Sequence, residues 1–157
     1  MTVPVERRAA RVLLVDSAER VLLLHGGDPS APERGVWWST PGGGLEPGES
    51  PAQAAARELG EETGLRVDAA ALGPVVHERV TEFCFDGCDY RQSEHYFLLR
   101  VDAHEVDTSA EDAVVDPGVT GHRWWAAPQL RSTVEVIFPA ELSAVLERLG
   151  CAAAPDT

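Results

Sequence analysis

The sequence lacks any long hydrophobic run. Within its 157 residues, no apolar stretch approaches the roughly 20 residues that a transmembrane helix needs. The beginning, MTVPVERRAARVLLVD, has only a short apolar run and no small-residue cleavage site, so it does not resemble a secretory signal. We therefore expect no membrane association and a cytoplasmic location.

Internal repeats and signs of a second domain are also absent from the sequence. A chain of this length suffices for one domain with a buried core. Hydrophobic residues at 44% and charged residues at 25% are ordinary for a globular protein. The sequence predicts a single domain over residues 1–150 and a frayed tail over residues 151–157.

Positive charge is scarce. The 13 basic residues face 26 acidic ones, which gives a formal net charge of −13 and a pI near 4.7. Such a chain repels polyanions, so we expect no nucleic acid polymer as a partner. Small nucleotides stay open, because a metal ion held by acidic side chains inverts the local field.

Cysteine is rare, and its number is odd. Cys84, Cys88 and Cys151 argue against a disulfide framework. A zinc site could combine the first two with His77 or His95, but a fourth well-spaced ligand is missing. We expect three free thiols.

The sequence does contain a mixed pattern of strands and helices. Two apolar runs, at residues 11–15 and 20–24, fit strands that are buried on both faces. Residues 75–85 and 90–101 flank an Asp-Gly turn and predict a long hairpin. The remaining expectations are a polar lead over 1–8, a short strand and turn over 66–72, a strand over 122–126, and a final helix over 138–150.

The stretch GGLEPGESPAQAAARELGEETGL, residues 43–65, predicts a capped helix. Ser50 stands at the N-cap with Pro51 at the first helical position and Gln53 three residues beyond the cap, a capping-box pattern. Gly64 ends the helix, because glycine accepts the left-handed conformation there. The spacing predicts one buried stripe, formed by Ala52, Ala56, Leu59 and Thr63.

Three glutamates gather on another face of this helix. Glu58, Glu61 and Glu62 stand at i, i+3 and i+4, so their side chains crowd together. Each like-charge pair at this spacing costs about 0.2–0.5 kcal/mol, and Mg²⁺ prefers oxygen ligands of this kind. Three glutamates alone would also fit a solvated acidic face.

The spacing of all the marked residues between Gly43 and Leu65 is more specific than the three glutamates alone. Gly43, Glu49, Arg57-Glu58-Leu59, Glu61-Glu62 and Gly64-Leu65 match the nine constrained positions of the Nudix box, and a Trp-containing segment with a Pro-Gly-Gly turn precedes it. The chain therefore resembles the Nudix hydrolases, MutT among them. The periodicity supports the α/β class only. The resemblance implies a Nudix-type α/β/α sandwich with a mixed β-sheet.

The resemblance also implies an activity. Enzymes of this family hydrolyse the diphosphate linkage of a nucleoside diphosphate joined to another group, using Mg²⁺ or Mn²⁺. A nucleoside triphosphate or a nucleotide sugar fits, and Thr81 and Glu82 stand where two known subclasses carry a marker proline or tyrosine. The implied alternative is a catalytically inactive Nudix-like domain that binds a nucleotide. A third reading is an acidic cation-binding domain without nucleotide recognition.

The implied site follows the box. Glu58, Glu61 and Glu62 are the expected metal ligands, with Glu61 or Glu62 doubling as general base unless the base lies outside the box. Arg57 belongs to the same catalytic group and is expected to pair with Glu49 or a box glutamate. The expected support for the metal and diphosphate comes from Gly43, Gly44 and Glu49.

Other residues extend this site. A further acidic ligand often comes from a later strand or loop in the family, and Glu94, Glu111 and Asp112 are the candidates, the last two in an acidic loop over residues 104–120. Trp37 and Trp38 could stack on a base, although burial in the core is favoured. Dimers are common in the family, so a homodimer is one expectation for the assembly.

Overall fold

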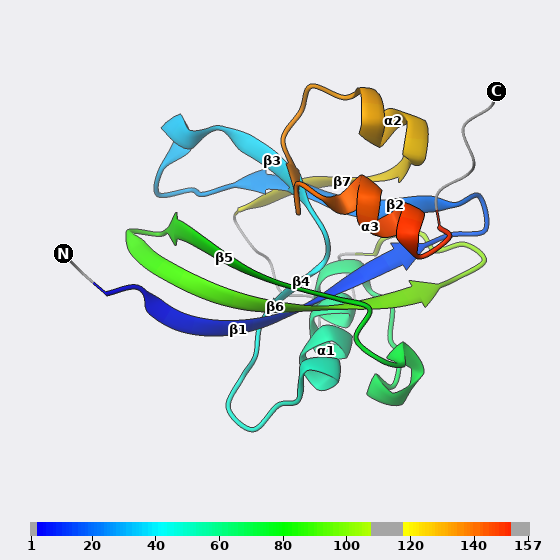
Figure 1. The fold of residues 1–157 in the computed structure, drawn as a ribbon, viewed down its shortest axis with the longest axis horizontal. Helices are drawn as coiled ribbons and strands as arrows, with labels where there is room; N and C mark the ends of the chain where they lie inside the picture. The colour runs from blue at the N-terminus through cyan, green and yellow to red at the C-terminus, as the bar shows by residue number, and fades with distance from the viewer. Residues whose placement is uncertain (1–2, 108–117, 152–157) are drawn as a thin grey trace.

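The computed structural model describes residues 3–107 and 118–151 (Figure 1). Within these ranges a single sheet holds β1 (Val5–Val15), β2 (Arg20–Gly27), β3 (Val36–Ser39), β4 (Gly42–Gly44), β5 (His77–Phe85), β6 (Cys88–Arg100), β7 (Val119–Ala126) and β8 (Ile137–Phe138). The helices are α1 (Pro51–Thr63), α2 (Ala127–Ser132) and α3 (Leu142–Arg148), with short 3₁₀ helices at Pro32–Arg34 and Ala69–Leu72.

The sheet is mixed and divides into two halves. The order is β5-β6-β1-β2-β3-β8, with β4 paired to β1 and β7 paired to β2. β1 runs parallel to β6 from Val5 opposite Tyr90 to Val15 opposite Arg100. β1 pairs with β2 in antiparallel fashion at Val15 opposite Val21, near the turn that joins the two strands. The β1–β6–β5 half and the β2–β3–β7 half therefore diverge from that turn, as Figure 1 shows.

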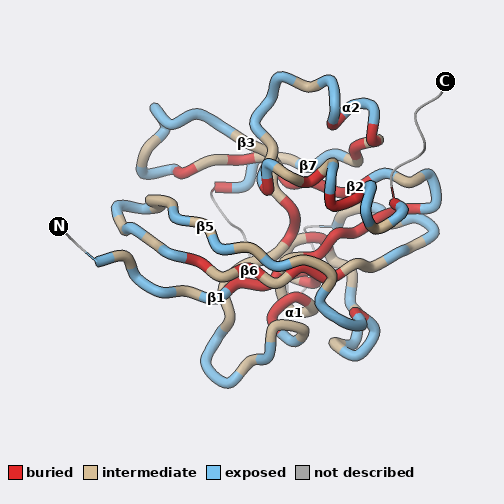
Figure 2. Tube along the Cα trace, in the orientation of Figure 1, coloured by how far each residue is buried: buried red, intermediate tan, exposed pale blue. Residues whose placement is uncertain are grey.

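Both faces of β1 are buried, and each packs against a different helical layer. Even-numbered side chains such as Val12 and Leu14 join Leu59 of α1 in one core cluster. Odd-numbered side chains such as Leu13 join Leu146 of α3 in the other. Burying one such side chain contributes about 1.5–3 kcal/mol. The predicted α/β/α sandwich with a mixed sheet is confirmed, and Figure 2 shows the buried positions running along the centre of the sheet and the inner side of α1.

Helix α1 begins and ends as predicted. Ser50 accepts a hydrogen bond from the backbone N–H of Gln53, whose side chain in turn accepts from Ser50 N. Gly64 closes the helix in the left-handed conformation, with φ at 79°. The predicted buried stripe is only half right, because Ala52 and Ala56 are partly exposed. The buried positions are Ala54, Ala55, Leu59, Gly60 and Thr63.

Three local predictions were wrong. The expected polar lead belongs to β1 from Val5 onward, because β6 offers it a parallel partner along its whole length. Residues 66–72 hold a 3₁₀ helix at Ala69–Leu72 rather than a strand. The final helix begins at Leu142 rather than near Phe138, because Ile137 and Phe138 pair with β3 as β8.

The expectation of free thiols is confirmed. Cys84, Cys88 and Cys151 are free thiols. Cys151, at the start of the predicted tail, is 1% exposed and packs in the core cluster under α3. No helix within the described ranges is long and apolar enough to cross a membrane.

Two of the predicted site residues cannot be placed. Glu111 and Asp112 lie outside the residues that the structure describes.

Candidate active site

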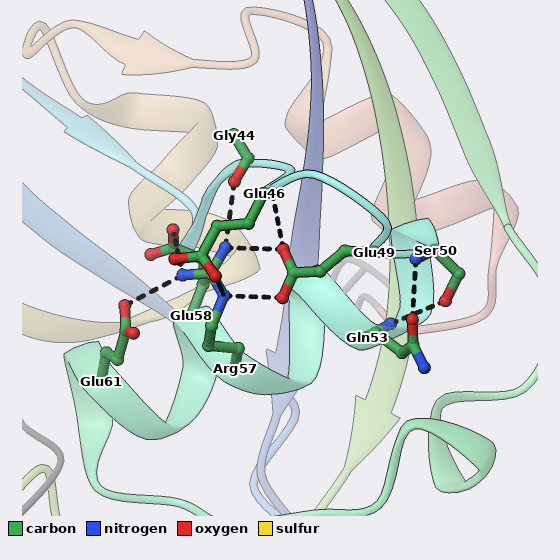
Figure 3. A network of polar contacts seen from close by, with 8 residues as sticks. All are labelled: Gly44, Glu46, Glu49, Ser50, Gln53, Arg57, Glu58 and Glu61. Atoms are coloured by element: carbon green, nitrogen blue, oxygen red, sulfur yellow. Dashed lines mark hydrogen bonds and ion pairs between the residues drawn. The ribbon is translucent and has the colours of Figure 1, made fainter.

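Arg57 joins helix α1 to the loop that precedes it (Figure 3). Its Nε and Nη2 atoms donate to the two carboxylate oxygens of Glu49 at 2.7 and 3.0 Å, and Nη2 also donates to the carbonyl oxygen of Gly44 at 3.1 Å. The hydrogen bond from Arg57 is the main reason that the pKa of Glu49 lies below its usual range. Arg57 therefore makes the pairing that the sequence predicts, and Glu49 and Gly44 are its partners.

The same guanidinium also contacts two box glutamates. Its Nη1 donates to Glu58 Oε1 at 3.1 Å and to Glu61 Oε2 at 3.2 Å. Burial raises the pKa of Glu58, and the neighbouring charge of Glu61 acts in the same direction, while Arg57 opposes both. Glu58 is thus a carboxylate whose surroundings supply too little positive charge, which is the condition that a bound cation relieves.

Glu62 points toward the glycine strand. Its Oε1 accepts a 2.8 Å hydrogen bond from the backbone N–H of Gly42. Glu58 approaches the neighbouring Gly43 so closely that a Cβ there would lie 2.6 Å from Glu58 Oε1. Strand β4 therefore receives Glu58 because Gly43 has no side chain there, and it binds Glu62 through the N–H of Gly42.

A large pocket opens between the two halves of the sheet, with a volume of about 600 Å³. Glu58 and Glu62 line one wall together with Gly42 and Gly43, whereas Glu61 does not belong to the lining. A volume of this order suits a small-molecule ligand, for which pockets span about 300–1,000 Å³. Of the three glutamates that the sequence groups together, Glu58 and Glu62 face the pocket, and Arg57 contacts Glu58 and Glu61.

The donor set at this wall suits a divalent cation in part. Among the residues described, no group of three or more His, Cys, Asp or Glu side chains is arranged to hold a metal ion. Glu58 and Glu62 offer hard oxygen atoms, and Mg²⁺ is commonly bound by one or two carboxylates while waters and substrate phosphates complete its shell. Two carboxylates at the wall of an open pocket fit that arrangement.

Aromatic side chains line the other part of the pocket. Trp37, Phe83, Phe85 and Phe138 belong to the lining, and Trp37 meets Phe138 edge-on at 6.0 Å between ring centroids. Trp38 instead packs against His25 and Trp125 beside the core. Of the two tryptophans, Trp38 has the expected core role, and Trp37 faces the pocket.

Glu94 lies in the pocket lining but is saturated by donors. It is 3% exposed, and its oxygens accept from Arg11 Nε at 3.0 Å, Arg79 Nη1 at 3.1 Å, Gln92 Nε2 at 2.8 Å and the Tyr96 hydroxyl at 3.0 Å. Burial opposes its charge, but Arg11 and these hydrogen bonds prevail and hold the pKa of Glu94 below its usual value. Its role as an additional metal ligand stays a prediction, and a metal ion would have to displace these donors.

Arginines also line the pocket, and the sequence analysis did not name them among the candidate site residues. Each of the thirteen basic residues in the chain is an arginine, and four of them line this pocket, namely Arg7, Arg11, Arg34 and Arg79. The alternation of Arg7 and Arg11 along β1 was the one available signal, since it places both side chains on one face of a strand. Their meeting with Arg79 depends on long-range strand pairing.

Comparisons with known proteins show the family of the chain. A family model described as NUDIX domain matches residues 5–146. An RNA pyrophosphohydrolase from Novosphingobium aromaticivorans is 32% identical over 134 residues, which cover 78% of this chain and 78% of that protein. An octanoyltransferase from Myxococcus xanthus is 65% identical over 53 residues, but these cover 34% of this chain and only 14% of that protein's length.

Solved structures share the fold at lower identity. The MutT protein from Methanosarcina mazei Go1 superposes with a TM-score of 0.69 at 19% identity, and the match covers 96% of each chain. A bifunctional NMN adenylyltransferase/ADP ribose pyrophosphatase from Francisella tularensis, complexed with AMP and Mn ion, gives a TM-score of 0.63 at 21% identity over 97% of this chain and 44% of that one. At these identities the likeness shows the fold alone.

Proposed function

Since the chain belongs to the Nudix hydrolase family, whose enzymes act on phosphoanhydride bonds, we propose that it hydrolyses the diphosphate linkage of a small nucleotide with the help of a divalent cation. The observation that carries this proposal is the pocket itself. Its lining includes the carboxylates of Glu58 and Glu62 and also several aromatic rings. A nucleotide has the matching combination of charged phosphates and flat base.

The carboxylates account for the proposed cation. Glu58 and Glu62 would hold Mg²⁺ or Mn²⁺ at the wall beside Gly42 and Gly43. A bound divalent cation neutralises charge on phosphoryl oxygens and makes a neighbouring water more acidic. A carboxylate within hydrogen-bond reach of that water can then take its proton.

Glu62 is the better candidate for that proton transfer than Glu61. Both were open from the sequence, but Glu62 lines the pocket while Glu61 Oε2 accepts a hydrogen bond from Arg57. Arg57 is not part of the pocket lining, but its hydrogen bonds connect Glu58 to Glu49 and Gly44. Its proposed role is to fix the carboxylates where the substrate's phosphates arrive.

The proposed substrate is a free nucleotide, either a nucleoside triphosphate or a nucleotide sugar. The net charge of −13 disfavours the long polyanionic contacts that a nucleic acid polymer makes. The relative named RNA pyrophosphohydrolase makes the 5′-triphosphate end of an RNA a necessary comparison. A cytoplasmic location, a homodimer and the boundary at residue 150 stay predictions from the sequence.

A turnover screen tests this proposal. Nucleoside triphosphates, nucleotide sugars, dinucleotides and a short 5′-triphosphate RNA are incubated with Mg²⁺ or Mn²⁺, and released phosphate, pyrophosphate or nucleotide is measured. Glu62→Gln should abolish most turnover, while Glu147→Gln removes the same charge from an exposed position on α3 and should leave it unchanged. Nucleotide binding without turnover would favour the inactive binding domain. Metal affinity without nucleotide binding would favour the simple cation-binding domain.

A further inference from the structure

We infer that Arg11 and Arg79, held in place by the buried Glu94, form a phosphate-binding pair on the floor of the pocket. The pair takes a phosphate group of the substrate beside the one that faces Glu58 and Glu62. This inference rests on the proposed function, because it assigns a second phosphate position within the same pocket. It also gives Glu94 a role different from that of a metal ligand.

Strand register brings the two arginines together. Glu94 on β6 stands opposite Arg79 on β5 and opposite Ala9 on β1, and Arg11 follows Ala9 by two residues along β1. Because side chains two residues apart along a strand share a face, Arg11 and Arg79 flank Glu94 from its two sides. All three line the pocket.

The carboxylate is hidden, while the guanidinium groups remain partly accessible. The side chain of Glu94 is 4% exposed, whereas those of Arg11 and Arg79 are 22% and 20% exposed. Glu94 and Glu141 balance much of the charge of the two arginines, because Glu141 Oε2 lies 3.5 Å from Arg79 Nε. What this part of the pocket offers a phosphate is therefore the guanidinium N–H groups that do not contact Glu94. Both arginine side chains line the pocket, so a ligand there can reach these N–H groups.

Both guanidinium groups are fixed by further contacts. Arg11 Nη1 donates to the carbonyl oxygen of Thr40 at 2.9 Å, in addition to its bond with Glu94. Arg79 Nε lies 3.5 Å from Glu141 Oε2. A guanidinium held on one edge presents its remaining N–H groups in a fixed orientation, and this planar arrangement suits phosphate oxygens.

Glu94 itself has no free position for a phosphate or an ion. Each of its oxygens accepts two hydrogen bonds, from Arg11 and Gln92 on one oxygen and from Arg79 and Tyr96 on the other. Glu94 therefore serves to hold the guanidinium groups of Arg11 and Arg79 in place. Its removal would leave two cations that repel each other at the floor of the pocket.

The position of Arg11 connects this pair to the acidic wall. Arg11 is close enough to Glu62 and Glu58 to interact with their charges. A diphosphate with one phosphate at the acidic wall would therefore place its other phosphate near Arg11 and Arg79.

Calorimetric titration of the full chain with inorganic pyrophosphate, in EDTA, tests the pair without a metal or a reaction. The wild type should bind pyrophosphate, and Arg79→Gln should lower the affinity at least about tenfold, because hydrogen bonds to charged groups are lost. The matched control is Arg131→Gln, which removes the same charge from an exposed position on α2. Its affinity should stay within about twofold of the wild type, as expected for a distant exposed charge.

A second variant covers a folding failure of Arg79→Gln. Arg79→Lys keeps a cation beside Glu94 but loses the planar fork, so its affinity should fall about threefold or more while its melting curve stays cooperative. Equal affinity of the wild type and Arg79→Lys, or no binding by the wild type, would overturn the inference. If the wild type turns over nucleotides but Arg79→Gln binds pyrophosphate as tightly as the wild type, the phosphate-binding pair is refuted and the proposed function stands. If pyrophosphate binding depends on Arg79 but the wild type turns over no nucleotide, the proposed function is refuted and the pair stands.

Discussion

Arg57 Nε lies 2.7 Å from Glu49 Oε2, and Arg57 Nη2 lies 3.0 Å from Glu49 Oε1. This two-point pair ties the middle of α1 to the loop that carries β4 into the helix. Because Gly44 offers its carbonyl oxygen to the same guanidinium, the loop is held at two places. Arg57 of α1 therefore helps to position β4, the glycine strand that contacts Glu58 and Glu62.

Arg57→Lys should destabilise the protein although it preserves the charge. A lysine is a single point donor and cannot serve Glu49, Gly44 and Glu58 together. We expect a loss of about 1 kcal/mol in the free energy of unfolding, because the lost hydrogen bonds join partly buried groups. Urea unfolding at pH 7 measures it. Arg131→Lys on the surface of α2 should change the value by less than about 0.5 kcal/mol, and an equal effect of both variants would contradict the assigned role.

The stabilisation by Glu49 should depend on pH. Its pKa in the folded state lies below the unfolded value, which is about 4.3 for a glutamate. Its contribution is therefore fully present above that pH and is lost as the pH falls through the folded pKa. Unfolding curves of the wild type and Glu49→Gln should differ clearly at pH 7 and converge at lower pH. A difference that stays constant over this range would show that the charge of Glu49 is not what matters.

The sequence predicted the helix that carries the site because its signals are local. Ser50, Gln53 and Gly64 act within one turn of their own positions, and each has the predicted cap role. The helix that carries the glutamates is confirmed, while their joint role as metal ligands stays a prediction. Glu62 turns to the N–H of Gly42, twenty residues away, and Glu61 turns to Arg57. Those partners, and not helical spacing alone, decide which carboxylates face the pocket.

The pocket floor could not be predicted in the same way. Arg11 and Glu94 are separated by 83 residues along the chain, and their contact exists because β1 pairs in parallel with β6. Neither strand carries a local signal for that partner. The same pairing extends β1 to Val5, where composition indicated only a polar lead. Parallel register is a property of the assembled sheet.

Glu62 and Glu61 should differ in their effect on turnover. Glu62→Gln removes a carboxylate from the pocket wall, and we expect a loss of at least about 100-fold in kcat/KM, since even partners of metal ligands cost 10–100-fold when removed. Glu61→Gln leaves the lining intact and should cost less. Steady-state rates on the substrate found by the screen provide the comparison. A larger loss for Glu61→Gln would transfer the main role to that residue.

Glu94→Gln should lower stability far more than an exposed substitution of the same kind. It leaves the partly exposed side chains of Arg11 and Arg79 with no carboxylate between them, and breaking an ion pair that has a buried partner costs about 3–5 kcal/mol. At about 2–4 °C per kcal/mol for a chain of this size, the Tm should fall clearly. Glu82→Gln, on the exposed side of β5, is the control and should leave the Tm nearly unchanged. Similar melting temperatures for both variants would argue against the ion-pair network.

Two glycine variants should separate activity from stability. In Gly43→Ala the new Cβ would lie 2.6 Å from Glu58 Oε1, which is the end of a flexible side chain, so the carboxylate should move while the fold persists. In Gly48→Ala the Cβ meets open space, but φ is +82°, and left-handed backbone costs other residues about 1–2 kcal/mol. We expect reduced turnover with little change in Tm for Gly43→Ala, and the reverse for Gly48→Ala. Thermal melts and nucleotide turnover on both variants measure the two effects. If Gly43→Ala retains full turnover, the position of the Glu58 carboxylate does not matter for catalysis.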